Sequence, residues 1–322
     1  MNRTYGGFLP LELNDGKEYF CDYESKLQRF NSVKAALDYV IKKIGVTKIY
    51  IPIYYCPSTT QALQNMHSNV VFYHIDETFS IEKMPDEANV AIILVNYFGC
   101  LEKQIKEIVK QLKNAVVIID NAHAFFSSPI IKNKVWNIYS AKKFFGVPDG
   151  AYAISLDIVC EKQKLSTSYD YSSFLLLSYE KGTNEAYALK KESDKIIASR
   201  YDSMSKLAQG ILKNVNYDDV KKKRVDNWRA LCNGLSDINE LGRLDECAGY
   251  LYPLLISNGG DKVKRYLVNN KIFVPTLWNG EALMKKGNDF ELNLSRNGVF
   301  LPVDQRYNVD DMKYIIKTIK ET

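Results

Sequence analysis

The sequence predicts an α/β protein in which a large domain, with a mainly parallel sheet between helices, precedes a small C-terminal α+β domain. Between Ser32 and about Ser155, segments with the apolar period of amphipathic helices alternate with short β-branched or aromatic runs, which is typical of strands joined by crossover helices. After Leu165 the pattern becomes mainly helical. A chain of 322 residues, 46% of them apolar, can bury cores for both parts. We expect the domains to span residues 1–215 and 216–322.

The elements of the large domain are expected to alternate along the chain. Asn31 and Ser32 are suited to cap the first helix, because their side chains can accept hydrogen bonds from its free N–H groups. The expected helices cover residues 33–44, a segment from 59 onward, and 101–112. The expected strands cover residues 48–53, 70–74, 90–95, 115–119, 135–139 and 151–155.

The second half of the chain predicts a different mixture of elements. Charged helical segments are expected over residues 189–197 and 217–235, strands over 250–256 and 272–274, and a final helix from Val309 onward. The basic run Lys221–Arg224 lies within the second helical segment. We interpret it as the solvated face of a helix rather than as a binding patch.

Composition argues against several classes of function. Lys and Arg number 43 and Asp and Glu 38, so the net charge is only +5 and is spread along the chain. This weakens a nucleic-acid or anionic-membrane interpretation. The N-terminus lacks an apolar signal region, and no stretch approaches the roughly 18 uninterrupted apolar residues of a membrane span. We therefore expect a soluble cytoplasmic protein.

The cysteines and histidines argue against a metal site. The six cysteines lie far apart without a C-x-x-C pair, and only three histidines are present. We expect the cysteines to be free thiols in a reducing compartment. They are Cys21, Cys56, Cys100, Cys160, Cys232 and Cys247.

The first candidate for chemistry is the tetrad Asp120-Asn121-Ala122-His123. Four apolar residues, Val116 to Ile119, deliver Asp120 to the end of a buried strand, where ligand sites of open parallel sheets lie. A buried carboxylate there needs a cation or a donor as partner. Two interpretations remain open: Asp120 caps the next turn while His123 fills a polar pocket, or both residues belong to a site.

The second candidate is the segment 139–150, which places Lys142 and Lys143 between a strand and the pair Phe144-Phe145. An ammonium in apolar surroundings has a lowered pKa and becomes nucleophilic, so one of these lysines could form a Schiff base. The alternative is an ordinary turn whose lysines extend to solvent.

Together these motifs resemble the fold-type-I pyridoxal-phosphate (PLP) enzymes and, within them, the DegT/DnrJ/EryC1/StrS sugar aminotransferases. Members share Asp-x-Ala-[Gln/His] at a strand end, then Ser-x-x-Lys and a glycine pair. Here the corresponding residues are Asp120 to His123, Ser140 to Lys143, and Gly150-Ala151. The resemblance implies a fold-type-I PLP transferase and selects Lys143, rather than Lys142, as the Schiff-base lysine.

The resemblance also implies a role for each motif residue. Asp120 would keep the pyridine nitrogen protonated, so that the ring acts as an electron sink. His123 would pack beside the ring or its 3-hydroxyl. Lys143, once displaced by the substrate amine, would become the base that moves the proton.

Further cofactor ligands follow from the same resemblance. The family binds the cofactor phosphate at a helix start, which corresponds here to Ser32 and Val33, with the hydroxyl of Ser140 added. Val33 replaces the usual glycine. These three residues are the expected phosphate ligands.

Two loops of the family contact the cofactor ring or the substrate. Residues 52–59 resemble the loop whose second aromatic covers the ring, but Cys56 stands at that position. Either Cys56 lies over the ring, or Tyr55 shifts to stack on it. Residues 95–99 resemble Val-His-Leu-Tyr-Gly, with Asn96 in the place of the histidine near cofactor or substrate.

The leading hypothesis is a PLP-dependent aminotransferase that transfers an amino group from glutamate to a keto group of a nucleotide-linked sugar, in surface glycan biosynthesis. Lys143 argues against the family's sugar dehydratases, which carry histidine there. The alternative is a PLP-binding but non-catalytic homologue, suggested by Val33 and by residues 201–205, which replace the family's Asn-x-Arg-Met-[Ser/Thr]. A nucleotide-binding Rossmann protein is excluded, since no G-x-G-x-x-G follows the first strand.

We expect a homodimer with the site at its interface, without nucleic acid or membrane as partner. The family places each cofactor between subunits, and the chain holds 22 Tyr and 14 Phe, some of them on loops. Tyr201 stands where the family's cross-subunit asparagine would be. Its hydroxyl, or a neighbouring backbone N–H, is expected to replace that phosphate contact.

Overall fold

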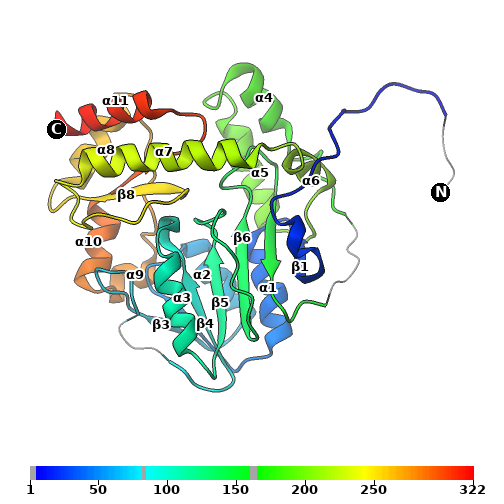
Figure 1. Cartoon of the computed structure of the whole chain (residues 1–322), viewed down its shortest axis with the longest axis horizontal. Coiled ribbons are helices and arrows are strands. Elements are labelled where there is room, and N and C mark those ends of the chain that lie inside the picture. The colour runs from blue at the N-terminus through cyan, green and yellow to red at the C-terminus, as the bar shows by residue number, and fades with distance from the viewer. Residues whose placement is uncertain (1–4, 82–84, 160–164) are drawn as a thin grey trace.

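The computed structural model describes residues 5–81, 85–159 and 165–322. A large sheet with helices on both faces forms the lower part in Figure 1, and a smaller group of helices around a two-stranded sheet lies above it. Cys160 lies outside the described residues, whereas the other five cysteines are free thiols. Within the described ranges, no helix is long and apolar enough to cross a bilayer.

The large sheet has seven strands in the order β1-β7-β6-β5-β4-β2-β3. β2 to β6 pair in parallel, whereas β7 is antiparallel to both β6 and β1. The predicted mainly parallel sheet is therefore confirmed. The strands are β1 (Leu27–Phe30), β2 (Lys48–Pro52), β3 (Val70–Tyr73), β4 (Val90–Val95), β5 (Val116–Asn121), β6 (Val135–Ser140) and β7 (Ala151–Ile154).

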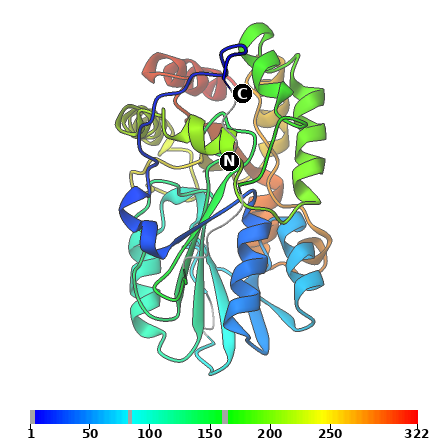
Figure 2. The ribbon, with the colours of Figure 1, turned by 90° about the vertical axis from the view of Figure 1, so that its right-hand side faces the viewer.

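Helices cover both faces of this sheet. Figure 2 shows α1 and α2 on one side and α3 on the other. Every residue of β4 is buried, as expected for a parallel strand with both faces covered. The helices of this part, including short 3₁₀ turns, are η1 (Cys21–Lys26), α1 (Val33–Ile44), α2 (Pro57–Met66), η2 (Tyr97–Gly99), α3 (Glu102–Gln111), α4 (Ser173–Lys181), α5 (Tyr187–Ala198) and α6 (Lys206–Leu212).

Helix α1 begins and ends where its sequence predicts. The Ser32 hydroxyl accepts a hydrogen bond from the Ala35 N–H at 3.2 Å, which satisfies one free donor of the first turn. Gly45 ends the helix in the left-handed region, with φ +58°, where glycine carries no steric penalty. The cap places the first N–H groups of α1 beside the end of β1.

The C-terminal part packs α7 against α11 over the sheet β8–β9, whose two strands are antiparallel. Its elements are α7 (Tyr217–Leu235), β8 (Leu251–Leu255), α8 (Gly260–Asn269), α9 (Glu281–Lys286), α10 (Asp289–Asn297), β9 (Gly298–Pro302) and α11 (Val309–Lys320). The domain boundary at 215/216 remains a prediction, next to the start of α7.

The predicted strand at 272–274 is wrong. The Ile272 N–H donates to the Leu267 carbonyl at 2.8 Å and closes the end of α8, and the next residues form an irregular segment. Pro275, which follows, has no N–H to offer a sheet. The strand that pairs with β8 is instead β9, which begins directly after α10.

Candidate active site

The sheet brings the predicted residues to one edge, because β1, β2, β4, β5 and β6 all run in the same direction. Their carboxyl ends face the C-terminal part, where the Tyr250 N–H donates to the His123 carbonyl at 3.1 Å. This is the edge where ligands of open α/β sheets bind. The predicted residues near these strand ends are Ser32, Val33, Tyr55, Cys56, Asn96, Asp120, His123, Ser140 and Lys143.

Asp120 is buried near the carboxyl end of β5, and its carboxylate accepts hydrogen bonds from two donors. Its Oδ1 accepts a hydrogen bond from the Ala122 N–H at 2.8 Å, and its Oδ2 accepts one from the Tyr55 hydroxyl. Burial raises the pKa of this carboxyl, while the two donors and the charge of Lys143 oppose the rise. The partner that the buried carboxylate requires is therefore, in the first place, Tyr55.

Lys143 and His123 contact each other beside this carboxylate. The Lys143 Nζ lies 3.0 Å from the His123 Nε2 and 4.8 Å from the centre of the Tyr250 ring. Burial, with a further contribution from Lys143, holds the pKa of His123 well below its usual value. The imidazole is therefore neutral near pH 7.

The Lys143 contact bears on the tautomer of His123. A charged lysine amine can only donate, so an ammonium at this distance from Nε2 places the ring proton on Nδ1. That Nδ1 is buried and finds no acceptor within the described part of the chain. A buried donor without a partner is costly, so the site offers one N–H to a ligand with an acceptor atom.

The neighbouring lysine points elsewhere. The Lys142 Nζ pairs with the Asp194 carboxylate on α5 at 2.7 Å. Burial lowers the pKa of Lys142, and the Asp194 contact opposes this shift. Of the two lysines that the sequence presents, Lys143 is the one beside Asp120 and His123.

A tight turn holds the lysine segment. The Ala141 carbonyl accepts the N–H groups of Phe144 and Phe145 at 2.9 and 3.0 Å. Both phenylalanine rings are buried against Phe125. Gly150, with φ +138°, leads the chain into β7. A Cβ added at Gly150 would lie 3.2 Å from the Ala141 Cβ. The turn therefore fixes the backbone on both sides of the lysine pair.

The predicted phosphate ligands lie at adjoining strand ends. Ser140 pairs with Ala151, and Ala151 pairs with Phe30. The Asn31 carbonyl accepts the Gly150 N–H at 3.0 Å, which joins the start of α1 to the end of the lysine turn. The first turn of α1, at Val33, and Ser140 therefore lie at one corner of the site, and free N–H groups at a helix start are a feature that attracts anions.

Residues 200–202 reach the same corner. The Asn31 N–H donates to the Asp202 carbonyl at 2.9 Å and its side chain to the Arg200 carbonyl at 3.2 Å. Tyr201, between them, is 51% exposed. Its side chain is therefore available to a surface outside the chain.

The loop after β2 places Tyr55 against Asp120 and Cys56 at the start of the next helix. Tyr55 is buried with its hydroxyl on Asp120, and its ring lies 6.4 Å from that of Trp278. Cys56 lies at the start of α2, with its Sγ 3.3 Å from the Ser58 Oγ. Burial alone would raise the pKa of this thiol, but the contacts with Ser58 and Lys143 outweigh burial and lower it.

Asn96 is engaged away from the lysine. Its amide nitrogen donates to Asn121 and Ser127 at 3.0 and 3.2 Å, and its oxygen accepts the Leu101 N–H at 3.1 Å. These bonds fix the turn after β4. The structure does not bring the Asn96 side chain into contact with Lys143 or His123.

Two aromatic residues at the centre of the site were missed by the sequence analysis. The Trp278 ring stacks on His123 at 5.2 Å with an interplanar angle of 19°, and the Tyr250 ring lies 4.9 Å from His123. Both come from the C-terminal part. No local motif marks either residue. The only signal was the aromatic wealth of the chain, which does not single them out.

The seven-stranded sheet with one antiparallel strand, the lysine turn and the two-stranded C-terminal sheet define the fold of the fold-type-I aminotransferases. No protein-family model matches the sequence, and no curated protein matches it. Solved structures of DegT/DnrJ/EryC1/StrS sugar aminotransferases nevertheless match more than 90% of the chain, at low sequence identity.

Three of these structures illustrate the similarity. Spr1654 from Streptococcus pneumoniae, in its PLP-form, has a TM-score of 0.63 at 15% identity and covers 93% of this chain and 88% of its own. A DegT DnrJ EryC1 StrS aminotransferase from Brucella abortus has a TM-score of 0.62 at 15% identity, covering 93% and 87%. DesV from S. venezuelae has 0.63 at 13% identity, covering 94% and 86%. At these identities the similarity shows the fold.

Proposed function

We propose that this protein is a PLP-dependent aminotransferase that moves an amino group from glutamate to a keto group of a nucleotide-linked sugar. The observation that carries the proposal is the placement of Lys143, with its Nζ 3.0 Å from His123 Nε2 at the strand edge that also holds Asp120. Structural neighbours support it. Spr1654 was solved in a PLP-form, and DesI was solved in the presence of its TDP-sugar product.

The residues present fit PLP. The unpartnered Nδ1–H of His123 suits the oxygen on the cofactor ring, the Asp120 carboxylate suits a protonated ring nitrogen, and Lys143 supplies the amine for the aldehyde. The first turn of α1, with Ser32 and Val33, and the Ser140 hydroxyl would hold the phosphate. When bound, PLP supplies an electron sink for the carbon that loses its proton.

The chain's own groups then divide the work. The Asp120 carboxylate is shielded from water. Its negative charge therefore stabilises a proton on a ring nitrogen that pairs with it. His123 stays neutral, so it donates from Nδ1 and adds no positive charge beside Lys143. Lys143 binds the cofactor and, once an amino donor has displaced it, its free amine is placed to carry a proton.

We propose further that the active form is a homodimer. Tyr201, next to the proposed phosphate corner, is exposed, as are large apolar side chains around α4, with Leu176 at 71% and Tyr179 at 92%. Exposed apolar clusters of this kind are typical of interaction surfaces. Light scattering is expected to give the mass of two chains. A fully PLP-loaded monomer would contradict the shared site.

The decisive test of the function is covalent labelling followed by a half-reaction. Borohydride reduction of the PLP-loaded protein should fix the cofactor to the peptide that contains Lys143, and Lys143→Ala should abolish labelling. Lys142→Ala is the matched control and should retain it, because Lys142 pairs with Asp194 outside the site. A label on Lys142, or no label, would contradict the proposal.

A second candidate, a PLP-binding protein without catalysis, is favoured by one observation. The Tyr55 hydroxyl already occupies the Asp120 oxygen that a ring nitrogen needs. The glutamate half-reaction separates the two candidates. An aminotransferase converts the absorbance of bound PLP to that of the amine form when glutamate is added, whereas a non-catalytic binder retains the PLP spectrum.

A further inference from the structure

Arg224 is a buried cation, so the prediction that the basic run Lys221–Arg224 forms a solvated helix face is wrong for this residue. It lies in the first half of α7, is 1% exposed, and forms no ion pair with any residue that the structure describes. Its guanidinium lies 4.4 Å over the Phe144 ring. Burial lowers the pKa of Arg224 to about 10, with Asp304 opposing the shift, so the side chain stays charged at pH 7. A charge this deeply buried requires other compensation.

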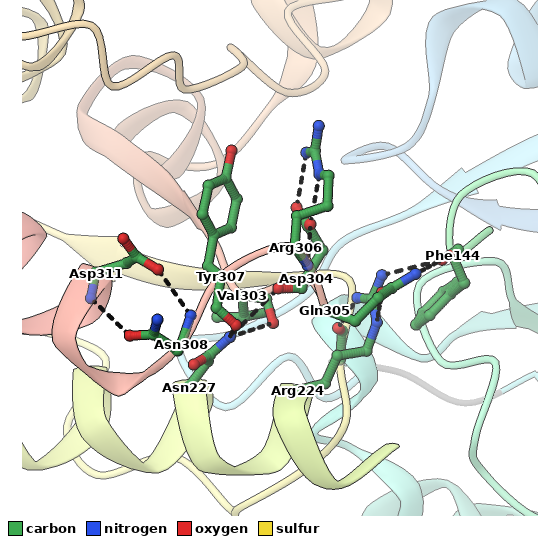
Figure 3. Close-up of polar contacts among 11 residues, drawn as sticks. Phe144, Arg224, Asn227, Val303, Asp304, Gln305, Arg306, Tyr307, Asn308 and Asp311 are labelled. Atoms are coloured by element: carbon green, nitrogen blue, oxygen red, sulfur yellow. Dashed lines mark hydrogen bonds and ion pairs between the residues drawn. The ribbon is translucent and has the colours of Figure 1, made fainter. Parts of the chain in front are cut away.

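Three backbone or amide oxygens provide that compensation. The guanidinium donates to the Gln305 Oε1 at 3.0 Å, to the Gly249 carbonyl at 2.8 Å and to the Phe144 carbonyl at 3.4 Å. The Gln305 Nε2 donates to the same Phe144 carbonyl at 2.7 Å. Figure 3 shows both side chains converging on Phe144 from α7 and from the loop before α11.

Phe144, whose carbonyl accepts hydrogen bonds from Arg224 and Gln305, directly follows Lys143 in the chain. The Phe144 N–H is fixed by the Ala141 carbonyl at 2.9 Å, and its carbonyl is fixed by Arg224 and Gln305. Its ring lies beneath the guanidinium. Lys143 cannot change its backbone direction unless these contacts break.

Arg224 also fixes the other side of the lysine. The guanidinium also donates to the carbonyl of Gly249. This residue precedes Tyr250, whose ring lies 4.8 Å from the Lys143 Nζ. A Cβ at Gly249 would lie 2.0 Å from the Phe98 carbonyl oxygen, so this close approach requires glycine. One guanidinium therefore contacts both the residue that follows Lys143 and the residue that precedes Tyr250, whose ring lies beneath the lysine amine.

The loop that carries Gln305 is itself anchored. Asn227, one turn after Arg224 on the same face of α7, donates to the carbonyls of Val303, Asp304 and Tyr307 at 3.0–3.3 Å. A capping box at Asn308 then starts α11. The Gln305 amide is thus preorganised before it meets Phe144.

We propose that Arg224 and Gln305 form a clamp on the Phe144 carbonyl that directs the Lys143 amine toward His123, so that the C-terminal part positions the lysine. Both are positioning residues, since they act through Phe144. The inference rests on the proposed function only in taking Lys143 as the reacting lysine.

Gln305→Glu separates positioning from simple stability. The glutamate keeps an acceptor for Arg224 and adds an opposite charge, but when ionised it has no donor for the Phe144 carbonyl. We expect a thermal midpoint at or above that of the wild type, together with a freer Lys143. Gln104→Glu is the matched control, because Gln104 on α3 also donates to a backbone carbonyl, that of Thr78, at 3.1 Å.

Lysine reactivity tests the clamp without cofactor. In the PLP-free protein, reductive methylation with formaldehyde and cyanoborohydride is followed by peptide mass spectrometry. The rate at Lys143 should rise about 2- to 10-fold in Gln305→Glu, the range for one lost hydrogen bond, while the rate at Lys142 stays constant. An absorbance titration should show PLP binding weakened by a similar factor.

The outcomes are distinct. A Gln305→Glu protein that labels at Lys143 and binds PLP like the wild type overturns the clamp. Equal acceleration at Lys142, or in the Gln104→Glu control, also overturns it, since the effect would then be general loosening. A wild-type protein that never takes up PLP refutes the proposed function, yet the methylation rates still decide whether the clamp exists.

Discussion

Tyr55→Phe removes the hydroxyl that occupies the Asp120 Oδ2 and leaves the aromatic ring in place. Both groups are buried, and the acceptor is a carboxylate, so the lost hydrogen bond is of the charge-assisted kind. Such bonds contribute about 1.5–3 kcal/mol. The free energy of unfolding of the PLP-free protein should therefore fall by about that amount.

The same substitution should strengthen PLP binding. In the proposed complex, a pyridine nitrogen that takes the same Asp120 oxygen would compete with the Tyr55 hydroxyl, so we expect the wild type to weaken that bond when the cofactor enters. Tyr55→Phe has no such bond to lose. Since 1.4 kcal/mol corresponds to a factor of ten, the affinity should rise about 10-fold, with an upper bound of about 100-fold.

Two measurements check this pair of opposite changes: urea unfolding of the PLP-free protein and an absorbance titration with PLP. Tyr54→Phe is the control. The Tyr54 hydroxyl is buried with no partner in the described ranges, so its removal should leave both quantities unchanged or raise the stability slightly. If Tyr55→Phe weakens PLP binding, the hydroxyl holds the cofactor rather than competing with it, and the reasoning is refuted.

Three further predictions concern buried ionisable groups. Asp120→Asn keeps the shape but removes the charge, so PLP should still bind while the glutamate half-reaction, followed by stopped-flow absorbance, slows by ~100-fold or more. Burial lowers the pKa of His123, so below about pH 6.5 the unfolded chain takes up a proton that the folded protein refuses. Denaturant unfolding should therefore show His123→Gln losing about 1 kcal/mol less stability than the wild type between about pH 6.5 and 5.5. Tyr171→Phe leaves the buried Asp149 carboxylate with the Ser205 N–H as its remaining donor among the described contacts of the chain, and should lower the unfolding free energy by about 1–3 kcal/mol; an unchanged midpoint would contradict this.

The sequence predicted the central elements of the fold well, for a physical reason. Continuous apolar runs such as β4 occur only where both faces of a strand are buried, and the helical pattern of α7 is long enough to leave little ambiguity. The predicted bounds of both elements therefore agree with the structure to the residue. Strand β1 was missed because Gln28 and Arg29 interrupt its apolar pattern. Arg29 is tolerated because it pairs with Glu18 and Glu24, which no local pattern shows.

The sequence predicted which candidate residues lie together only where strand order and direction determine their positions. Asp120, His123 and Lys143 stand at the ends of neighbouring parallel strands, so recognising the strands was enough to bring them together. The contact of Tyr55 with Asp120 requires a side chain to reach from the loop after β2 past β4 to β5. Such a contact depends on side-chain direction, which periodicity does not contain.

The two halves of the proposed chemistry depend on different parts of the chain. Asp120 takes its two donors from the large sheet part, at Tyr55 and Ala122. His123 is instead enclosed by two aromatic rings of the C-terminal part. In the proposed complex, the charge at a ring nitrogen would therefore depend on groups of the large sheet part.

The surroundings of the lysine amine depend on how closely the C-terminal part packs. Tyr250 lies under Lys143, and the Arg224 clamp holds both segments. A ligand that displaces the C-terminal part would alter the lysine while leaving the Asp120 contacts intact. Substitutions in the clamp should therefore change how Lys143 reacts without changing the protonation of the ring, and substitutions at Tyr55 should do the reverse.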